Sequence, residues 1–128
     1  MFDKNKEYTR TEIQNSVGGE LQNYLPSKNN IILAGCFNKK MNPDCPYEIQ
    51  AGNKPGVKRK AEKLISQPET IFPVFVKDSN ECKKYNFVGY FRCIGGSNRK
   101  ENIMKAEKKS GRHGELAYVF QLEKVKVK

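Results

Sequence analysis

The stretch NIILAGCFNKKMNPDCPYEIQAGNKPG, residues 30–56, contains two short apolar runs separated by a polar loop. Residues 31–37 form a near-continuous apolar run, which predicts a strand buried on both faces. Residues 47–51 predict a shorter second strand, and GNKPG at residues 52–56 predicts a turn. The loop between the runs carries two lysines, two prolines and one carboxylate, Asp44. Because a plain hairpin needs only a short turn such as Asn-Gly, this loop is a candidate site.

The rest of the chain predicts two helices and three further strands. Thr9 and Glu12 form a capping-box pattern, which predicts a helix over residues 9–16. Apolar residues at positions 57, 61, 64 and 65 predict a helix over residues 57–67 that Pro68 ends. Residues 71–77, 83–94 and 116–127 predict strands, and Pro73 requires an edge position or a bulge in the first of them. Alternation in the second strand predicts one shared face for Tyr85, Phe87, Gly89, Phe91 and Cys93. Residues 95–114 are predicted to be a polar, mobile loop.

This order of elements predicts an α+β domain built on a small, strongly curved β-sheet or barrel with two flanking helices. The length suits one domain covering residues 1–128. No apolar run approaches the roughly 20 residues that cross a bilayer. The N-terminal stretch MFDKNKEYTR has no signal-peptide apolar region. We therefore expect a soluble, intracellular protein, either cytoplasmic or associated with the nucleoid or nucleus.

Positive charge is concentrated in the second part of the chain. The net charge is +10 in total, and residues 1–50 contribute none of it, with six basic and six acidic side chains. Such an asymmetry favours a polyanionic partner, although it also suits a solvated, soluble surface. If the partner is a nucleic acid, binding weakens steeply with salt. The candidate phosphate-binding residues are Lys39, Lys40, Lys54, Lys58, Arg59, Arg99, Lys100, Lys105, Lys108, Lys109 and Arg112.

The cysteine and histidine pattern predicts neither a metal site nor catalysis. The four cysteines are spaced C-x8-C and C-x10-C, without the C-x2-C pairs of structural zinc sites. Cys36 and Cys93 lie in apolar runs, where a free thiol acts as a small hydrophobe. The single histidine, His113, has no evident catalytic partner. We expect no metal, cofactor or enzymatic activity; a glycosylase or nuclease using Asp44 or Glu48 ranks lowest among the alternatives.

Five motifs occur in the order AGCF at residues 34–37, QAG at 50–52, PVFV at 73–76, YNFVGYFR at 85–92 and FQLE at 120–123. In this order they resemble SRA (SET-and-RING-associated) domains of the PUA-like superfamily, over residues 30–125. The resemblance implies a module that reads a modified cytosine in duplex DNA by flipping the base into a pocket. It also implies a modification-dependent restriction system, with a nuclease in another domain or subunit.

The same resemblance and the chemistry of a base pocket suggest five pocket residues. Phe37 stands where the family has a pocket tyrosine, so stacking is kept and a hydroxyl is lost. Phe37 and Tyr47 are the candidate stacking residues. Asn42, Asp44 and Gln50 are the candidate readers of the base edge, with Asp44 accepting from the cytosine amino group. The alternative is structural: both aromatic residues are core residues, and Asp44 only shapes a turn between two prolines.

A second function remains open on sequence grounds. A PUA-like protein can also bind RNA, reading single-stranded or modified bases on an exposed sheet face. The residues expected on that face are Tyr85, Tyr90 and Phe91.

Overall fold

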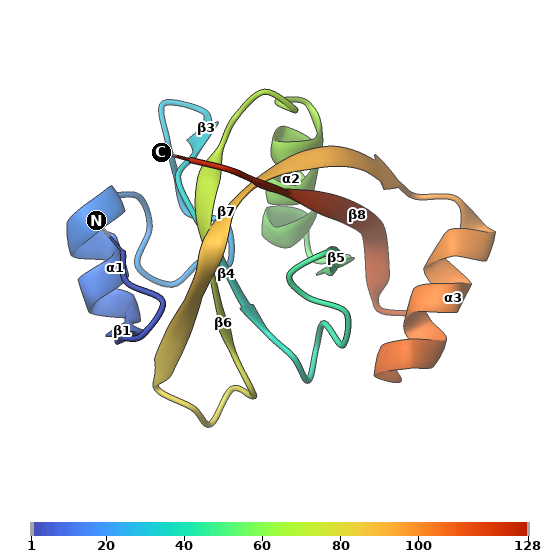
Figure 1. The fold of residues 1–128 in the computed structure, drawn as a ribbon. Helices are drawn as coiled ribbons and strands as arrows, with labels where there is room; N and C mark the ends of the chain where they lie inside the picture. Colours follow the sequence, from blue (N-terminus) through green and yellow to red (C-terminus); the bar gives the residue numbers. More distant parts are fainter. Residues whose placement is uncertain (1, 128) are drawn as a thin grey trace.

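The computed structural model describes residues 2–127 and has an α+β architecture, as expected. Eight strands and three helices follow one another along the described chain (Figure 1). They are β1 (Glu7–Thr9), α1 (Arg10–Val17), β2 (Ser27–Lys28), β3 (Ile31–Ile32), β4 (Gly35–Asn38), β5 (Glu48–Gly52), α2 (Pro55–Ile65), β6 (Phe72–Lys77), β7 (Lys84–Ser97), α3 (Lys100–Ser110) and β8 (Leu116–Val125).

Six of the strands form one mixed sheet in the order β4-β6-β7-β8-β5, with β1 paired to the start of β7. The β4–β6 pair is parallel and the other pairs are antiparallel. The long strands β7 and β8 bend together over α2 (Figure 1). β4 and β5 are the two ends of this order and do not pair with each other, so the sheet is not closed into a barrel.

The first predicted strand, residues 31–37, is divided into two elements. Ile31–Ile32 forms a hairpin with Ser27–Lys28, whose two connecting residues, Asn29 and Asn30, both have positive φ. This is the backbone that a two-residue hairpin turn requires. Gly35–Asn38 pairs instead with β6 and is buried throughout. The predicted burial on both faces therefore holds for this part alone, because Ile31 is 48% exposed.

The two predicted helices are present. Thr9 and Glu12 form the predicted capping box at the start of α1. α2 begins two residues earlier than expected because Pro55 occupies its first turn, where a missing N–H costs nothing. Leu64 and Ala61 of α2 are buried in the main core, beneath the curve of β7 and β8.

The predicted mobile loop at residues 95–114 is wrong, because Lys100–Ser110 forms the helix α3. Ala106 packs on Leu116 and Val119, with Ile103 beside them. Gly111 ends the helix in the left-handed conformation. Only this narrow apolar stripe marks the helix, and many charged residues surround it in the sequence.

The predicted single face of β7 is also wrong. A register shift opposite Val74 and Phe75 inserts an extra residue near Gly89, whose φ is +128°. Tyr85 and Phe87 therefore pack in the core under α1, whereas Phe91 and Cys93 pack in the core under α2. The same shift explains how β6 accommodates Pro73. The sequence predicted either an edge position or a bulge, and since β6 is an interior strand, the bulge is the alternative that the structure has.

Candidate functional site

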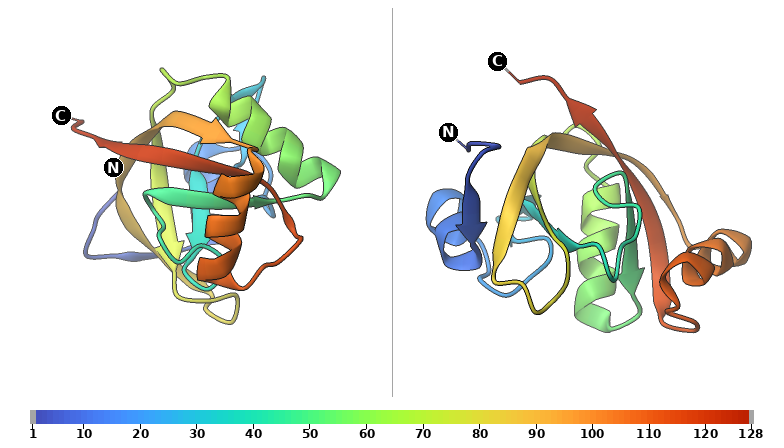
Figure 2. Two further views of the ribbon diagram at one scale, coloured as in Figure 1. Left: turned by 90° about the vertical axis from the view of Figure 1, so that its right-hand side faces the viewer. Right: turned by 60° about the horizontal axis from the view of Figure 1, so that its bottom comes forward.

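A pocket of about 470 Å³ lies among four stretches of the chain, which include residues of β4, β5 and α2 as well as connecting segments. Its lining comes from residues 22–24, 36–42, 50–57 and 112–115. The right-hand view of Figure 2 brings the end of the molecule with these segments forward. This volume falls in the range of roughly 300–1,000 Å³ that is usual for ligand pockets.

Two aromatic rings form adjacent walls of this pocket. Phe37 is only 2% exposed, and its ring folds back over Gly35, where an added Cβ would lie 2.7 Å from Cζ of Phe37. Tyr24 meets Phe37 with ring centroids 6.4 Å apart and planes at 62°. The Tyr24 hydroxyl donates to the carbonyl of Val57 at 2.8 Å. The two rings thus line the pocket at an angle to each other.

Arg112 supplies a half-buried positive charge to the pocket. Its Nη1 donates to the carbonyls of Gln50 (3.1 Å) and Met41 (3.3 Å), which connects β5 to the β4–β5 loop. Its Nε is buried and has no hydrogen-bond partner. Burial lowers the pKa of Arg112, and the charge of Glu115 opposes this shift. Because arginine keeps its proton in proteins, Nε is an unused donor of a cation.

Two of the predicted base-edge readers, Asn42 and Gln50, line the pocket but use their side chains for structure. Asn42 Oδ1 accepts from the backbone N–H of Gln50 at 2.8 Å. The amide of Gln50 points to α3, donating to the carbonyl of Ala106 at 3.0 Å and accepting from Ser110 at 2.6 Å. These bonds fix the pocket wall and leave the two side chains no free edge to offer a base.

The other two predicted pocket residues, Asp44 and Tyr47, do not line the pocket. Asp44 pairs with Lys109 at 2.7 Å, and Glu48 lies 3.5 Å from the same ammonium group. The hydrogen bond from Lys109 to Asp44 and the charge of Glu48 raise the pKa of Lys109. Tyr47 is 56% exposed and packs edge-on against Phe91. The structure thus brings Phe37, Asn42 and Gln50 together and leaves Asp44 and Tyr47 outside.

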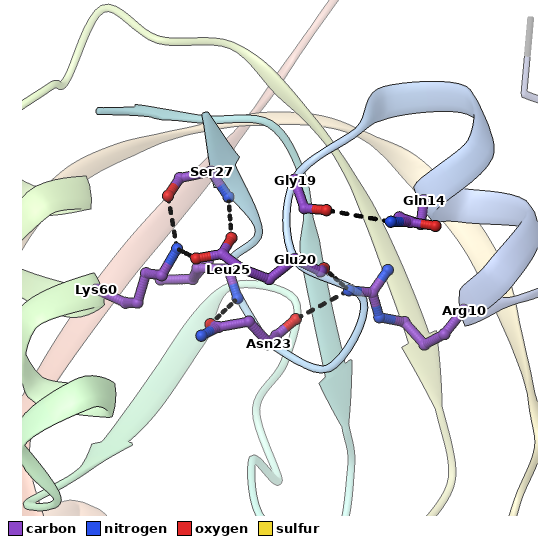
Figure 3. Close-up of polar contacts among 8 residues, drawn as sticks. All are labelled: Arg10, Gln14, Gly19, Glu20, Asn23, Leu25, Ser27 and Lys60. Atoms are coloured by element: carbon purple, nitrogen blue, oxygen red, sulfur yellow. Dashed lines mark hydrogen bonds and ion pairs between the residues drawn. The ribbon is translucent and has the colours of Figure 1, made fainter. Parts of the chain in front are cut away.

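The 19–27 segment, residues 19–27 from the end of α1 to the first residue of β2, carries Tyr24 and was not predicted to belong to the site. Figure 3 shows how it is held at both ends. Lys60 of α2 donates to Glu20 (2.6 Å) and to the hydroxyl of Ser27 (2.5 Å). Burial raises the pKa of Glu20, but the hydrogen bonds from Lys60 and from the Ser27 backbone outweigh it and lower that pKa to about 2.

Arg10 of α1 holds the other side of this segment (Figure 3). Its Nη2 donates to the carbonyl of Glu20 at 2.7 Å and to that of Asn23 at 3.3 Å. Arg10 thus holds two main-chain carbonyls that precede Tyr24, and Lys60 holds the side chains of Glu20 and Ser27 on either side of it. The only local signal for this arrangement was the aromatic residue in YLP, residues 24–26, which is weak evidence by itself.

The candidate phosphate-binding residues fall into two groups. Lys54 and Arg112 line the pocket, and Lys39, Lys40, Lys58 and Arg59 belong to the same connecting segments or to the first turns of α2. The others lie on α3 or at its N-cap: Arg99, Lys100, Lys105, Lys108 and Lys109. Three of the whole set are in ion pairs, Lys39 with Asp78, Arg99 with Glu101, and Lys109 with Asp44 and Glu48.

The four cysteines and the potential metal ligands of residues 2–127 do not gather into a cluster. All four cysteines are free, and burial raises the pKa of Cys36 to about 12. Within residues 2–127, no three His, Cys, Asp or Glu side chains are grouped to hold a metal ion. No helix in that part of the chain is both long and apolar enough to cross a membrane.

Comparison of this chain with protein-family models, with curated proteins and with solved structures found no match.

Proposed function

We propose that this protein is a DNA-binding module that recognises a modified cytosine in duplex DNA. The modified base flips out of the duplex and enters the pocket beside Tyr24 and Phe37. The observation that carries the proposal is the pocket itself: two aromatic walls, a half-buried guanidinium and Lys54 in one cavity of a strongly cationic chain. In this proposal the module supplies specificity to a modification-dependent restriction system, and a nuclease domain or subunit supplies cleavage.

The energetics of such a site are balanced. Extruding a base costs a few kcal/mol in lost stacking and pairing. Stacking on an aromatic ring returns about 1–3 kcal/mol, which Tyr24 can supply. Affinity beyond that must come from phosphate contacts. The cations of the pocket segments, with Lys54 and Lys58 nearest the start of α2, are placed to make them.

In this proposal Arg112 is the residue that forms hydrogen bonds to the edge of the base. Its guanidinium lines the pocket and offers donors only, so it suits the carbonyl oxygen or ring nitrogen of a pyrimidine edge. The amino group of cytosine needs an acceptor instead, and Asp44 does not reach the pocket lining to be one.

The RNA alternative loses the feature that suggested it. Phe91 is completely buried and Tyr85 is buried under α1, so the sheet offers no exposed aromatic platform from these two residues. RNA is therefore included as a competitor in the binding experiment that follows.

The test is a competition binding experiment with one labelled duplex. Competitors are duplexes carrying cytosine, 5-methylcytosine, 5-hydroxymethylcytosine, 6-methyladenine or a modified backbone, together with an RNA of the same sequence. We expect a modified cytosine to compete best and affinity to fall steeply with salt. Equal competition by every DNA, or the strongest competition by RNA, would overturn the proposal.

A pair of matched variants connects the result to the pocket. Tyr24→Leu removes the stacking ring and should weaken binding to the modified duplex by about tenfold or more. Tyr24→Phe keeps the ring and should bind nearly as well as the parent. Tyr47→Leu changes an exposed aromatic residue outside the pocket and should leave affinity unchanged.

A further inference from the structure

A second pocket, of about 450 Å³, adjoins the base pocket. Six residues line both cavities: Gln22, Asn23, Tyr24, Cys36, Asn38 and Met41. No acidic side chain lines the second pocket, and its one charged lining residue is Arg10. The polar lining is otherwise made of amides and hydroxyl groups, including those of Asn80 and Thr11. The two cavities thus form one continuous site, with Lys54 and Arg112 in the base pocket and Arg10 in the second pocket.

Unused donors mark both parts of this site. Within residues 2–127, the only buried side-chain nitrogen or oxygen atoms without a hydrogen-bond partner are Nη1 of Arg10 and Nε of Arg112. Leaving a buried polar group unpaired is costly, more so for a charged group, and native structures rarely keep one without a reason. Arg112 lines the base pocket and Arg10 lines the second pocket.

Arg10 also lacks a carboxylate partner. Its Nη2 bonds only to the backbone carbonyls of Glu20 and Asn23, and it takes part in none of the ion pairs among the described residues. In Figure 3 the dashed lines of its guanidinium all start from a single nitrogen. An arginine offers donors only, and without a carboxylate partner its charge is uncompensated, which favours an anion in the pocket that Arg10 lines.

We infer that the second pocket is an anion subsite, in which the guanidinium of Arg10 binds the phosphate attached to the nucleoside whose base occupies the first pocket. This inference rests on the proposed function for the base pocket. The shared chemistry is a phosphate oxygen, and it has two sources: the phosphodiester of a nucleic acid or the phosphate of a free nucleotide.

The first experiment follows arginine side-chain and backbone N–H resonances of the ¹⁵N-labelled protein. The probes are 5-methyl-2′-deoxycytidine, its 5′-monophosphate and inorganic phosphate. We expect the nucleoside to shift resonances of the base pocket alone, and the monophosphate to shift the Arg10 side chain as well and to bind about tenfold more tightly. Equal affinity of the two, with the Arg10 signals unmoved, would overturn the subsite.

Asn80→Asp tests the subsite without touching Arg10, whose removal would also loosen the 19–27 segment. Asn80 Oδ1 accepts from Asn38 at 3.0 Å, and aspartate keeps that acceptor while adding a negative charge to the second pocket. We expect this variant to lose the advantage of the monophosphate and to keep nucleoside binding. Asn98→Asp adds the same charge at an exposed position outside both pockets, and it should behave as the parent. Equal behaviour of the two variants would contradict the subsite.

A duplex arm identifies the source of the phosphate. Replacing the phosphate next to the modified cytosine by a neutral methylphosphonate should weaken binding to the parent but not further weaken binding to Asn80→Asp, because both changes remove one interaction. If only the free monophosphate depends on Arg10, the source is a nucleotide. If inorganic phosphate shifts the Arg10 resonances but the nucleoside does not bind, the base pocket is wrong and the anion subsite stands. If the nucleoside binds and phosphate has no effect, the base pocket stands and the anion subsite is wrong.

Discussion

Two segments flank the base pocket, and they are built in opposite ways. In the 38–47 loop, residues 38–47 between β4 and β5, the side chains of Asn42 and Asp44 are bonded to the protein itself. In the 19–27 segment Arg10 holds the main chain and Lys60 holds the side chains of Glu20 and Ser27, and the ring of Tyr24 is left to line the pocket. Polar side chains that look functional in the sequence thus serve the fold here, whereas the binding surface depends on clamps from other elements.

The largest effect on stability is expected at Phe37, which precedes the 38–47 loop and contacts Tyr24 of the 19–27 segment. Phe37→Ala should lower the free energy of unfolding by about 3–5 kcal/mol, because it empties a fully packed aromatic position. Tyr47→Ala, at the far end of the 38–47 loop, should cost about 0.5–1.5 kcal/mol, since the ring is mostly exposed. Urea denaturation of both variants measures the difference. Equal losses of stability would contradict the structure, in which Phe37 is buried and Tyr47 is exposed.

The next effect concerns the clamp on the 19–27 segment. The Lys60 side chain is only 9% exposed, and Lys60→Met removes its bonds to Glu20 and Ser27. We expect a loss of about 1–3 kcal/mol in stability, with faster amide exchange at residues 25 and 27. Lys63→Met, one turn along α2 and outside these bonds, is the matched control. Unchanged exchange in Lys60→Met would mean that the clamp does not hold the segment.

The same clamp gives a pH dependence of known sign. The pKa of Glu20 is about 2 in the folded protein, against an ordinary value of 4.5. A lowered folded pKa contributes stability that is present above pH 4.5 and lost as the pH falls from about 4.5 to about 2. After solvent screening of this half-exposed carboxylate we expect about 1 kcal/mol. Stability curves of the parent and of Glu20→Gln over this pH window should converge towards pH 2; parallel curves would contradict the assignment.

The smallest effect is expected at the acid of the 38–47 loop. Asp44→Asn removes a surface ion pair with Lys109 and should cost about 0.2–1 kcal/mol in stability. It should not weaken binding to a duplex with a modified cytosine. A loss of about tenfold in that affinity, absent with unmodified DNA, would return Asp44 to the role of base reader and break the contrast between the two segments.

Much of the fold follows from local sequence patterns, and the errors have physical causes. The capping box of Thr9 and Glu12 and the apolar stripe of α2 are local signals, and both helices were predicted. α3 was missed because only Ile103 and Ala106 mark its buried side. The two faces of β7 were merged because a bulge shifts the alternation without changing the sequence pattern. Barrel closure depends on whether β4 pairs with β5, which no local pattern encodes.

The predicted base-pocket residues that do line the pocket lie on β4 and β5 or in the loop between them. They are Phe37, Asn42 and Gln50. Tyr24 and Arg10 were missed because contacts with residues far along the chain bring them to the pockets. Arg112 was expected in a mobile loop, yet its bonds to Met41 and Gln50 make it part of the wall. Whether a polar side chain is free or already bonded is decided by tertiary contacts.

The central claim is that one flipped base enters the pocket beside Tyr24, and a crystal structure of the protein with a duplex containing one modified cytosine tests it most directly. The account predicts the modified base out of the helix, stacked on Tyr24 with its edge towards Phe37 and Arg112. A base that remains stacked in the duplex, or that lies elsewhere on the protein while this pocket stays empty, would contradict it.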